Sequence, residues 1–380
     1  MFDGMFASPA VVAETDDRAW LRAMLDAEVG LARAGARAGL VPQEALEAIE
    51  QAATPDRFDA AGIFRRAADS ATPVVPLLAD LRAALPQELR GYLHLGATSQ
   101  DIVDSALGLV ASRAMAPILD SLGGATEQLA RLAQAHRDTV HIGRTLLQRA
   151  EPTTFGAVCA GWLTAIAQAR SSLRGVREHR LAVQLGGPVG TLARYGDQAP
   201  EMLRRYAAEL GLAEPVLPWH TDRSRVAELA AALGIAAGAL GTVALDVVLL
   251  SQHEVGEVAE GSPGGSSAMP HKRNPARSVL ITAAVHRVPG LVGTVLAGMP
   301  QEYQRAAGRW QAEWATVSEL LRLTGGAAGH AAALLTELRV YPDRMRANAG
   351  PPAPGETGAA GLFVDRALAA YRAPTESGAT

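Results

Sequence analysis

A single helical pattern, Asp222–Glu260, limits most strongly what this chain can fold into. Within it, Leu229–Leu245 carries no charge for 17 consecutive positions and consists mostly of Ala, Gly and Leu. A continuous helix from Leu229 to Glu260 would be about 48 Å long, because each residue advances a helix by about 1.5 Å. Helices of this length bury their apolar side in a bundle, often one that several subunits share. The pattern therefore predicts a long bundle helix.

The uncharged stretch is slightly shorter than a membrane-spanning helix requires. Glu228 and Asp246 border it, and its small residues would allow close helix–helix approach in a bundle. The opening residues 1–17 lack a positive segment followed by an apolar run, so they do not resemble a secretory signal. We therefore expect a cytoplasmic protein that does not enter a membrane.

Composition predicts an all-α fold. The good helix formers Ala, Leu, Arg and Glu dominate, aromatic residues make up only 4%, and no window alternates apolar and polar residues over strand length. Ser99–His136 is expected to be one helix, or two that break at Pro117 or at Gly123 and Gly124. The other predicted helices are Asp17–Ala38, Gln43–Ala53, Leu77–Leu85, Thr154–Arg180, Asn274–Val288, Gln304–Leu323, Ala327–Glu337 and Gly361–Tyr371. Residues 349–355 are predicted to be a flexible linker.

Charge and cysteine content exclude several kinds of protein. The chain has 35 Lys and Arg against 39 Asp and Glu, a net charge of −4, without the clustered basic face that nucleic-acid-binding proteins carry. Cys159 is the single cysteine, which excludes an intrachain disulfide and a cysteine-rich zinc site. The histidines outside the motifs described below show no metal-ligand spacing. We expect no metal, no organic cofactor and no nucleic acid.

The segment Gly261–Pro275 carries most of the chemistry that the sequence reveals. It joins two helical stretches, and its glycines would make it mobile. Its hydroxyl, imidazole, cationic and amide groups belong to Ser266, Ser267, His271, Lys272, Arg273 and Asn274. Together they predict a loop that closes over an anion and supplies a nucleophile or a base. A phosphate-binding loop is excluded, because the segment lacks a Gly-Lys-Ser/Thr ending and no strand pattern precedes it.

This segment meets every fixed position of the pattern G-S-S-x-M-P-x-K-x-N-P and so resembles the signature loop of the fumarase/aspartase superfamily. The resemblance extends from about residue 15 to residue 348 and implies an all-α fold with a central bundle of long helices. It implies an N-terminal helical domain (1–104), a bundle domain (105–348), and a linker with a shortened C-terminal remnant (349–380). Relatives usually continue after Asn348 into a small helical domain that helps to cover the site.

Two further segments are similar to substrate-binding stretches of the superfamily. In Leu93–Asp101, Thr98 and Asp101 have the spacing of a capping box, so free N–H groups at a helix start would face a substrate carboxylate. A purely structural cap is the alternative. Gly143–Thr154 matches the second stretch. By this resemblance the substrate-binding residues are Thr98, Ser99, Arg144, Thr145, Gln148, His271 and Arg305.

The resemblance also assigns catalytic roles. Ser266 would exchange the proton on the carbon next to a substrate carboxylate, while Lys272 and backbone N–H groups of the loop stabilise its alkoxide. Asn274 would fix the loop or bind a carboxylate. Ser267 is the alternative to Ser266.

One departure from the superfamily narrows the chemistry. In fumarase, argininosuccinate lyase and adenylosuccinate lyase a histidine follows the threonine of the second stretch, where this chain has Leu146. The region that matches a further histidine of adenylosuccinate lyases, Ala68–Thr72, has none either. Such histidines help poor leaving groups to depart. A carboxylate has a pKa of about 4 and needs no acid. The chain therefore resembles the 3-carboxy-cis,cis-muconate cycloisomerase branch, in which a carboxylate closes a lactone.

Two more segments favour this branch. Pro218–Arg223 is similar to its W-H-T-x-R stretch, and Gln301–Trp314 to its Q-E-x-x-R-A-A-G-x-W-x-x-E-W. A substrate with three carboxylates needs several cations, and Arg305 is the best-placed candidate, with an ion pair between helices as its alternative role. The two tryptophans of the second segment are expected to pack in the core. We expect His94 and His220 to pack or to form hydrogen bonds.

Other functions remain open beside the cycloisomerase. A lyase that expels a good leaving group, such as nitrite from nitrosuccinate, to give fumarate would equally tolerate Leu146. A weakly active or non-catalytic homologue with a shortened C-terminus is the third possibility. The superfamily builds each active site from three subunits of a homotetramer, and a monomer would leave apolar surface of the Leu229–Glu260 helix exposed. The resemblance therefore implies a homotetramer that binds a small polycarboxylate.

Overall fold

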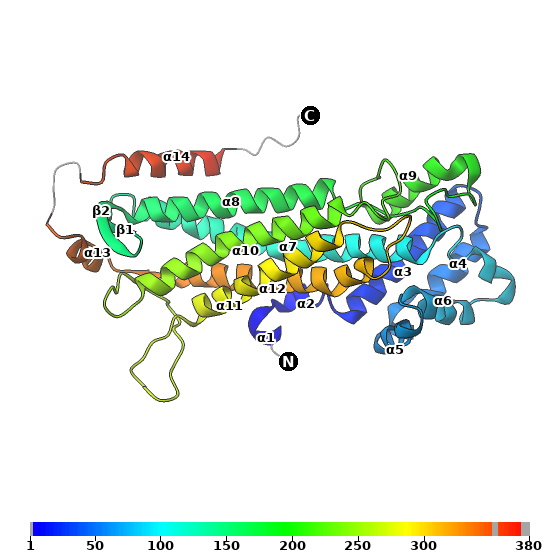
Figure 1. Ribbon diagram of the computed structural model, residues 1–380, viewed down its shortest axis with the longest axis horizontal. Coiled ribbons are helices and arrows are strands. Elements are labelled where there is room, and N and C mark those ends of the chain that lie inside the picture. The colour runs from blue at the N-terminus through cyan, green and yellow to red at the C-terminus, as the bar shows by residue number, and fades with distance from the viewer. Residues whose placement is uncertain (1–2, 352–355, 374–380) are drawn as a thin grey trace.

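Five long helices, lying side by side, form the body of the molecule in this computed structural model, which describes residues 3–351 and 356–373 (Figure 1). They are α7 (Ser99–Ala135), α8 (Phe155–His179), α10 (Ser224–Leu250), α11 (Ala276–Gly298) and α12 (Arg309–Glu337). α7 contacts α8 and α12, and α10 contacts α8, α11 and α12. The predicted mostly helical fold with a central bundle of long helices is confirmed. The linker residues 352–355 lie outside the described residues.

Shorter helices surround the start of α7 at one end of the bundle, on the right in Figure 1. They are α3 (Asp17–Arg37), α4 (Gln43–Ala52), α5 (Ala60–Arg66), α6 (Val74–Ala83) and α9 (Ala199–Leu210), with the 3-10 turns η1 (Pro55–Arg57), η2 (Ala67–Asp69), η3 (Gln87–Tyr92) and η4 (Gly196–Gln198). α3 begins where Asp16 accepts a hydrogen bond from the N–H of Ala19 at 2.8 Å, as an N-cap side chain does. The predicted substrate-binding stretch Leu93–Asp101 leads into the start of α7 and therefore lies at this end.

The opposite end of the bundle carries the strands. β1 (Val140–Thr145) and β2 (Gln148–Thr154) form an antiparallel hairpin, and β3 (Val258–Ala259) pairs with β4 (Arg339–Val340). The remaining helices are α1 (Asp3–Phe6) and α2 (Pro9–Val12), which contact α12, α13 (Pro342–Ala349), which contacts β1, and α14 (Ala360–Arg372), which contacts α8. The sequence pattern did not indicate these short strands, and the hairpin forms where the chain folds back over a two-residue turn.

α7 is unbroken over 37 residues, although Pro117 lies inside it. A proline within a helix costs roughly 3 kcal/mol, since it removes one backbone hydrogen bond and crowds the preceding turn. The side chains of Met115, Ile118 and Leu119 next to it are buried, and this packing offsets the cost. Of the two alternatives that the sequence left for Ser99–His136, the single helix is the one that forms.

Several predicted helix boundaries are wrong; the helix predicted to end at Val288, for example, continues as α11 to Gly298. The helix predicted over Asp222–Glu260 ends at Leu250. The chain then turns back through Gly256, with a φ of +61°, so that the N–H of the buried Glu257 donates to Leu250 O at 2.9 Å. The helices predicted over Gln304–Leu323 and Ala327–Glu337 are the single helix α12, which begins only at Arg309. Gly326 does not interrupt α12, because the backbone of Phe6 packs where a larger side chain would stand.

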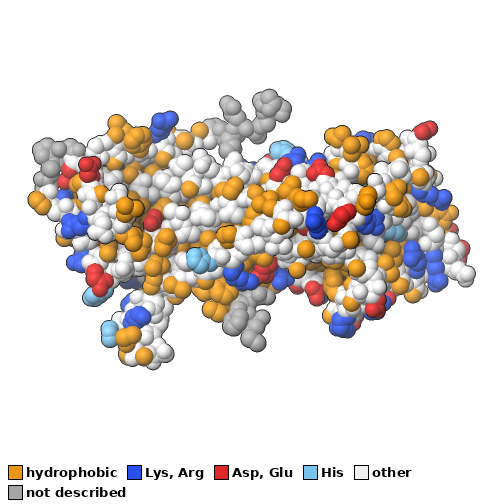
Figure 2. Space-filling model, viewed as in Figure 1, with side chains coloured by type: hydrophobic (Ala, Val, Ile, Leu, Met, Phe, Trp, Pro, Cys, Tyr) orange, Lys and Arg blue, Asp and Glu red, His pale blue; other side chains and the backbone are white. Residues whose placement is uncertain are grey.

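Among the described residues, α7, α10 and α11 are long and apolar enough to cross a membrane by length and composition alone. The most apolar window of α7 is 78% buried within the chain, against 44% for α10 and 22% for α11. Apolar side chains of α10 and α11 therefore remain at the surface, and Figure 2 shows hydrophobic side chains along one face of the bundle. They include Ile235, Leu245, Val279 and Leu296.

The division into domains at 1–104, 105–348 and 349–380 stays a prediction. α7 crosses the first of these boundaries as one continuous helix. The predicted C-terminal helix Gly361–Tyr371 is confirmed as α14, which buries Val364 and Leu368.

Candidate active site

The structure places the predicted site residues at two separate ends of the molecule. Thr98 and Ser99 begin α7, whereas Thr145 and Gln148 lie in the hairpin that follows the end of this helix. With 37 residues, α7 is about 55 Å long, so one chain does not bring these two groups together. Each end of the bundle thus carries half of a candidate site.

At the start of α7, Thr98 and Arg305 lie together. The N–H of Thr98 donates to Asp101 Oδ2 at 2.9 Å, so the expected capping box forms. Thr98 Oγ1 accepts a hydrogen bond from Arg305 Nη2 at 2.8 Å, and the same nitrogen donates to Pro188 O at 3.3 Å. Arg305 Nε is buried and has no hydrogen-bond partner among the described residues. Within the described part of the chain, Arg305 thus forms hydrogen bonds and no ion pair, and its guanidinium retains a donor for an anion.

Asp101 organises this end of the molecule. Besides Thr98, its carboxylate accepts hydrogen bonds from the N–H groups of Gly186 and Gly187, each at 2.9 Å. Its Oδ1 also lies 2.7 Å from His220 Nε2, and His220 is buried. Asp101 therefore fixes the Thr98 turn and the glycine loop together. The sequence identified Asp101 only as a helix cap.

His94 is held in a similar way. Its Nδ1 lies 2.7 Å from the buried carboxylate of Glu28. Burial by itself would lower the pKa of His94, but the attraction and hydrogen bond of Glu28 outweigh burial and raise this pKa above its usual value. His94 and His220 both form buried pairs with acids, as expected for residues that hold the scaffold.

The W-H-T-x-R stretch also contributes to the scaffold. Arg223 is fully buried and forms bidentate ion pairs with Asp104, at 2.8 and 3.0 Å, and with Glu313, at 2.6 and 3.0 Å. Trp310 Nε1 donates to Asp104 at 2.9 Å, and the guanidinium of Arg223 lies 4.8 Å from the ring centre of Trp219. This cluster joins α7, α10 and α12 inside the bundle and leaves its charged groups no free face for a substrate.

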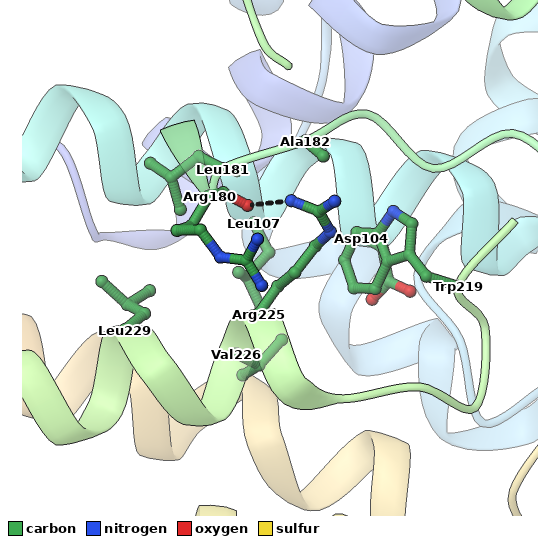
Figure 3. Close-up of a pocket in the computed structure, with 10 residues that line it drawn as sticks. Asp104, Leu107, Arg180, Leu181, Ala182, Trp219, Arg225, Val226 and Leu229 are labelled. Carbon is green, nitrogen blue, oxygen red and sulfur yellow. Dashed lines mark hydrogen bonds between the residues drawn. The ribbon is translucent and has the colours of Figure 1, made fainter. Parts of the chain in front are cut away.

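Beside this cluster lies a small cavity, shown in Figure 3. Asp104 and Trp219 line one side, and Arg225 crosses it to donate a hydrogen bond to the backbone oxygen of Arg180 at 2.9 Å. Its volume is about 10 Å³, which is room for a single water molecule. The cavity is therefore too small to be the substrate site.

At the other end, the loop from Gly261 to Pro275 joins β3 to α11 and projects from the bundle (Figures 1 and 2). Its base is closed by two backbone hydrogen bonds between Gly264 and Asn274, at 2.8 and 2.9 Å, and Asn274 Nδ2 donates to Gly265 O at 2.8 Å. Of the two roles expected for Asn274, this geometry favours fixing the loop.

The two adjacent serines of this loop differ. Ser266 Oγ accepts hydrogen bonds from the N–H groups of Met269, at 3.1 Å, and Ala268, at 3.4 Å. Donors aimed at an oxygen stabilise negative charge on it, which is what an alkoxide requires. Ser267 is the more exposed of the two. The geometry therefore favours Ser266 as the proton-exchanging residue.

Cations gather around a cavity beside this loop. His271, Lys272 and Arg273 are exposed on the loop and line the cavity together with Arg339 and Tyr341. Its volume is about 840 Å³, within the range of small-molecule sites. Arginine and lysine are the usual partners of carboxylates, so this cavity suits a small acid with several carboxylates.

The hairpin carries Thr145 and Gln148 to an exposed tip. These two residues pair across the turn, whose central residues Leu146 and Leu147 have φ angles of +49° and +63°. Positive φ at both central residues is typical of turns that favour Asn and Gly. Leu146 is 96% exposed and Leu147 73% exposed. The tip is therefore strained and apolar, and no other part of the described chain covers it.

Arg144 forms an ion pair within the chain. Its Nη1 and Nη2 donate to Glu257 Oε2 and Oε1 at 3.0 and 2.8 Å, and the carboxylate of Glu257 is fully buried. This geometry favours a role of Arg144 in the scaffold of the hairpin, and its role in substrate binding stays a prediction. Glu257 was missed because the sequence placed it inside a continuous helix.

Comparisons with known proteins identify the family. A family model described as "Lyase" matches residues 5–290. The chain is 46% identical to 3-carboxy-cis,cis-muconate cycloisomerase of Pseudomonas aeruginosa, over 92% of this chain and 78% of that protein. It is 44% identical to nitrosuccinate lyase of Streptomyces davaonensis, over 90% of this chain and 75% of that protein.

Solved structures agree with this match. The crystal structure of 3-carboxy-cis,cis-muconate lactonizing enzyme from Pseudomonas putida superimposes with a TM-score of 0.91 at 34% identity, covering 97% of this chain and 98% of that one. Together with the serine loop and the long-helix bundle, these matches show that the chain belongs to the lyase family of the fumarase/aspartase superfamily.

Proposed function

We propose that this protein is a cycloisomerase that closes 3-carboxy-cis,cis-muconate to 4-carboxymuconolactone, in the protocatechuate branch of the β-ketoadipate pathway. The observation that carries the proposal is Leu146, an apolar residue at the hairpin tip, in a chain that retains the whole serine loop. A carboxylate that adds to a double bond, or leaves in reverse, needs no acid at that position. The 46% identity to the 3-carboxy-cis,cis-muconate cycloisomerase of Pseudomonas aeruginosa supports the same reaction.

In this mechanism, a remote carboxylate oxygen of the substrate attacks the double bond and forms the C–O bond of the lactone. Negative charge then develops on the carboxylate next to the other alkene carbon, where His271 would stabilise it, while Lys272 would stabilise the oxygen of Ser266. Ser266 donates its proton to that carbon, and its oxygen, held by the N–H groups of Ala268 and Met269, takes a proton back from water. Thr98, Ser99, Thr145, Gln148 and Arg305 would bind the other carboxylates.

We further propose a cytoplasmic homotetramer in which different copies supply the two halves of each site. One chain separates Thr98 from Thr145 by the length of α7, so a complete site requires a second copy. The exposed apolar side chains of α10 and α11 offer the surface for such an assembly. Size-exclusion chromatography with light scattering is expected to give the mass of four chains, and an active monomer would contradict this.

A direct assay tests the proposed reaction. Lactone closure removes the conjugated diene of carboxymuconate, so the ultraviolet absorbance should fall when purified protein is added. Nitrosuccinate is the matched comparison, since nitrite also leaves without an acid and one relative is a nitrosuccinate lyase. Turnover of carboxymuconate alone supports the cycloisomerase. Turnover of nitrosuccinate alone would replace it with the lyase, and turnover of neither would favour the non-catalytic homologue.

A further inference from the structure

We propose that Glu257 is a positioning residue that holds the hairpin tip and the serine loop in one fixed arrangement. The inference rests on the proposed function, because these two segments carry Thr145, Gln148 and Ser266. The sequence did not single out Glu257, and the resemblance to the superfamily gave it no role. Glu257 contacts two distant segments of the chain, β1 and the stretch from Tyr341 to the end of α13.

The carboxylate of Glu257 is fully buried and completely used. Oε1 accepts hydrogen bonds from Arg144 Nη2 at 2.8 Å and from Asn348 Nδ2 at 2.7 Å. Oε2 accepts from Arg144 Nη1 at 3.0 Å and lies 3.0 Å from His141 Nε2. A carboxylate has about four acceptor positions, so these four contacts satisfy it. Arg144 and His141 belong to β1, and Asn348 belongs to α13.

The backbone of Glu257 leads directly into the serine loop. Its carbonyl accepts a hydrogen bond from the N–H of Tyr341 at 3.0 Å, and the next two residues form β3. Glu260 follows and accepts from the N–H of Ser278 at 2.9 Å and its Oγ at 2.8 Å, which ties the loop's first end to the start of α11. Both ends of the loop are thereby anchored, and Glu257 joins this anchor to the hairpin.

The strained turn at Leu146 and Leu147 explains why such an anchor matters. Residues with positive φ that lack glycine's freedom persist only where the surrounding structure holds them. Only Thr145 separates Arg144 from the turn, and Glu257 holds the guanidinium of Arg144 in a bidentate geometry. Loss of this carboxylate would leave the partly buried guanidinium of Arg144 without its ion-pair partner and release the turn.

Hydrogen exchange measured by mass spectrometry tests this role without substrate. Glu257→Gln should increase exchange in both the hairpin, residues 140–154, and the serine loop, residues 261–275. Glu260→Gln is the matched control, since Glu260 is also a buried glutamate of this segment, but it contacts α11. It should increase exchange at the start of α11 and in the serine loop, whose first end it anchors, and leave the hairpin unchanged. The proposal would be overturned if hairpin exchange did not change in Glu257→Gln, or if hairpin exchange increased equally in Glu260→Gln.

Kinetics with the turned-over substrate provide the second readout. Glu257→Gln should lower kcat by about 10- to 100-fold with a smaller change in KM, because a misplaced loop reacts slowly with a bound substrate. Arg144→Met should have a similar effect, and the double variant should be no worse than either single variant. Additive losses would contradict a shared action. If Glu257→Gln does not fold, Arg144→Lys, which retains the charge and loses the fork, carries the same predictions in milder form.

Discussion

At the scale of single residues, the two adjacent serines show how backbone geometry selects a reactive group. The family resemblance favours Ser266 over the adjacent Ser267, and the backbone of the folded loop distinguishes the two hydroxyls in the same direction. Two N–H groups point at the oxygen of Ser266. These donors would stabilise negative charge on this oxygen before the substrate arrives. Because Ser267 is adjacent and has the same hydroxyl group, its replacement is a suitable control for that of Ser266.

We predict that Ser266→Ala lowers kcat by at least about 1,000-fold, as loss of a reactive group commonly does. Ser267→Ala should change kcat by less than about 10-fold, since its hydroxyl is not held by the loop backbone. Steady-state rates with carboxymuconate check both values. The reverse order of effects would transfer the catalytic role to Ser267.

Glu257 gives a prediction about pH. Burial alone would raise its pKa, but hydrogen bonds from His141, Arg144 and Asn348 outweigh burial and lower the pKa to about 2. A carboxylate with a lowered pKa stabilises the folded state above its unfolded pKa of about 4.3, and this contribution is lost as the pH falls towards 2. Wild type should therefore lose up to about 3 kcal/mol of stability relative to Glu257→Gln between pH 5 and pH 2.

Urea denaturation of both proteins at the same concentration, at pH 7 and pH 3, measures this difference. The stability gap between wild type and Glu257→Gln should be constant near neutral pH and shrink in acid. A gap that is the same at both values would show that the ionised carboxylate does not stabilise the fold.

At the scale of elements, the hairpin combines a poor turn sequence with full exposure. Two leucines at positive φ cost about 1–2 kcal/mol each, while Asn and Gly are well suited to such a turn. The exchange of Leu146→Asn and Leu147→Gly should therefore raise the melting temperature and lower activity, provided that the apolar tip enters a site. Thermal unfolding and steady-state rates check this pair of effects. An unchanged rate would show that the tip has no part in the reaction.

The sequence predicted the bundle and the serine loop well, because both depend on local patterns. Helix-forming composition predicts helices such as α7, and the motif around Ser266 is contiguous in the chain. Prediction from the sequence failed where contacts between distant residues determine the structure. The end of α10 depends on Gly256 and on the contact of Glu257 with Arg144, which is 113 residues away. Helix propensity contains no trace of such a contact.

At the scale of the whole molecule, the two halves of the candidate site lie too far apart to act within one chain. Ser266 and Thr145 belong to one end of the bundle, and Thr98 and Arg305 to the other. The sequence matched all of these segments but could not show their separation, because motifs contain no distances. Assembly of several copies is the simplest way to unite them.

We predict that two inactive variants complement each other. Ser266→Ala and Arg305→Ala, dissociated, mixed in equal amounts and reassembled, should recover about a quarter of wild-type activity, because a quarter of the sites would draw both intact residues from different chains. Each variant treated alone in the same way is the control. If both residues acted within one chain, every site would keep one defect and the mixture would stay inactive.

The proposed function depends on one claim: a leaving group that departs without protonation makes an acid at position 146 unnecessary. The direct measurement is the turnover of a series of acids that differ in their leaving group: carboxymuconolactone in the reverse direction, nitrosuccinate, malate and aspartate. We predict turnover confined to the compounds that release a carboxylate or nitrite, with the lactone preferred. Turnover confined to malate or aspartate, which must release hydroxide or an amine, would contradict it.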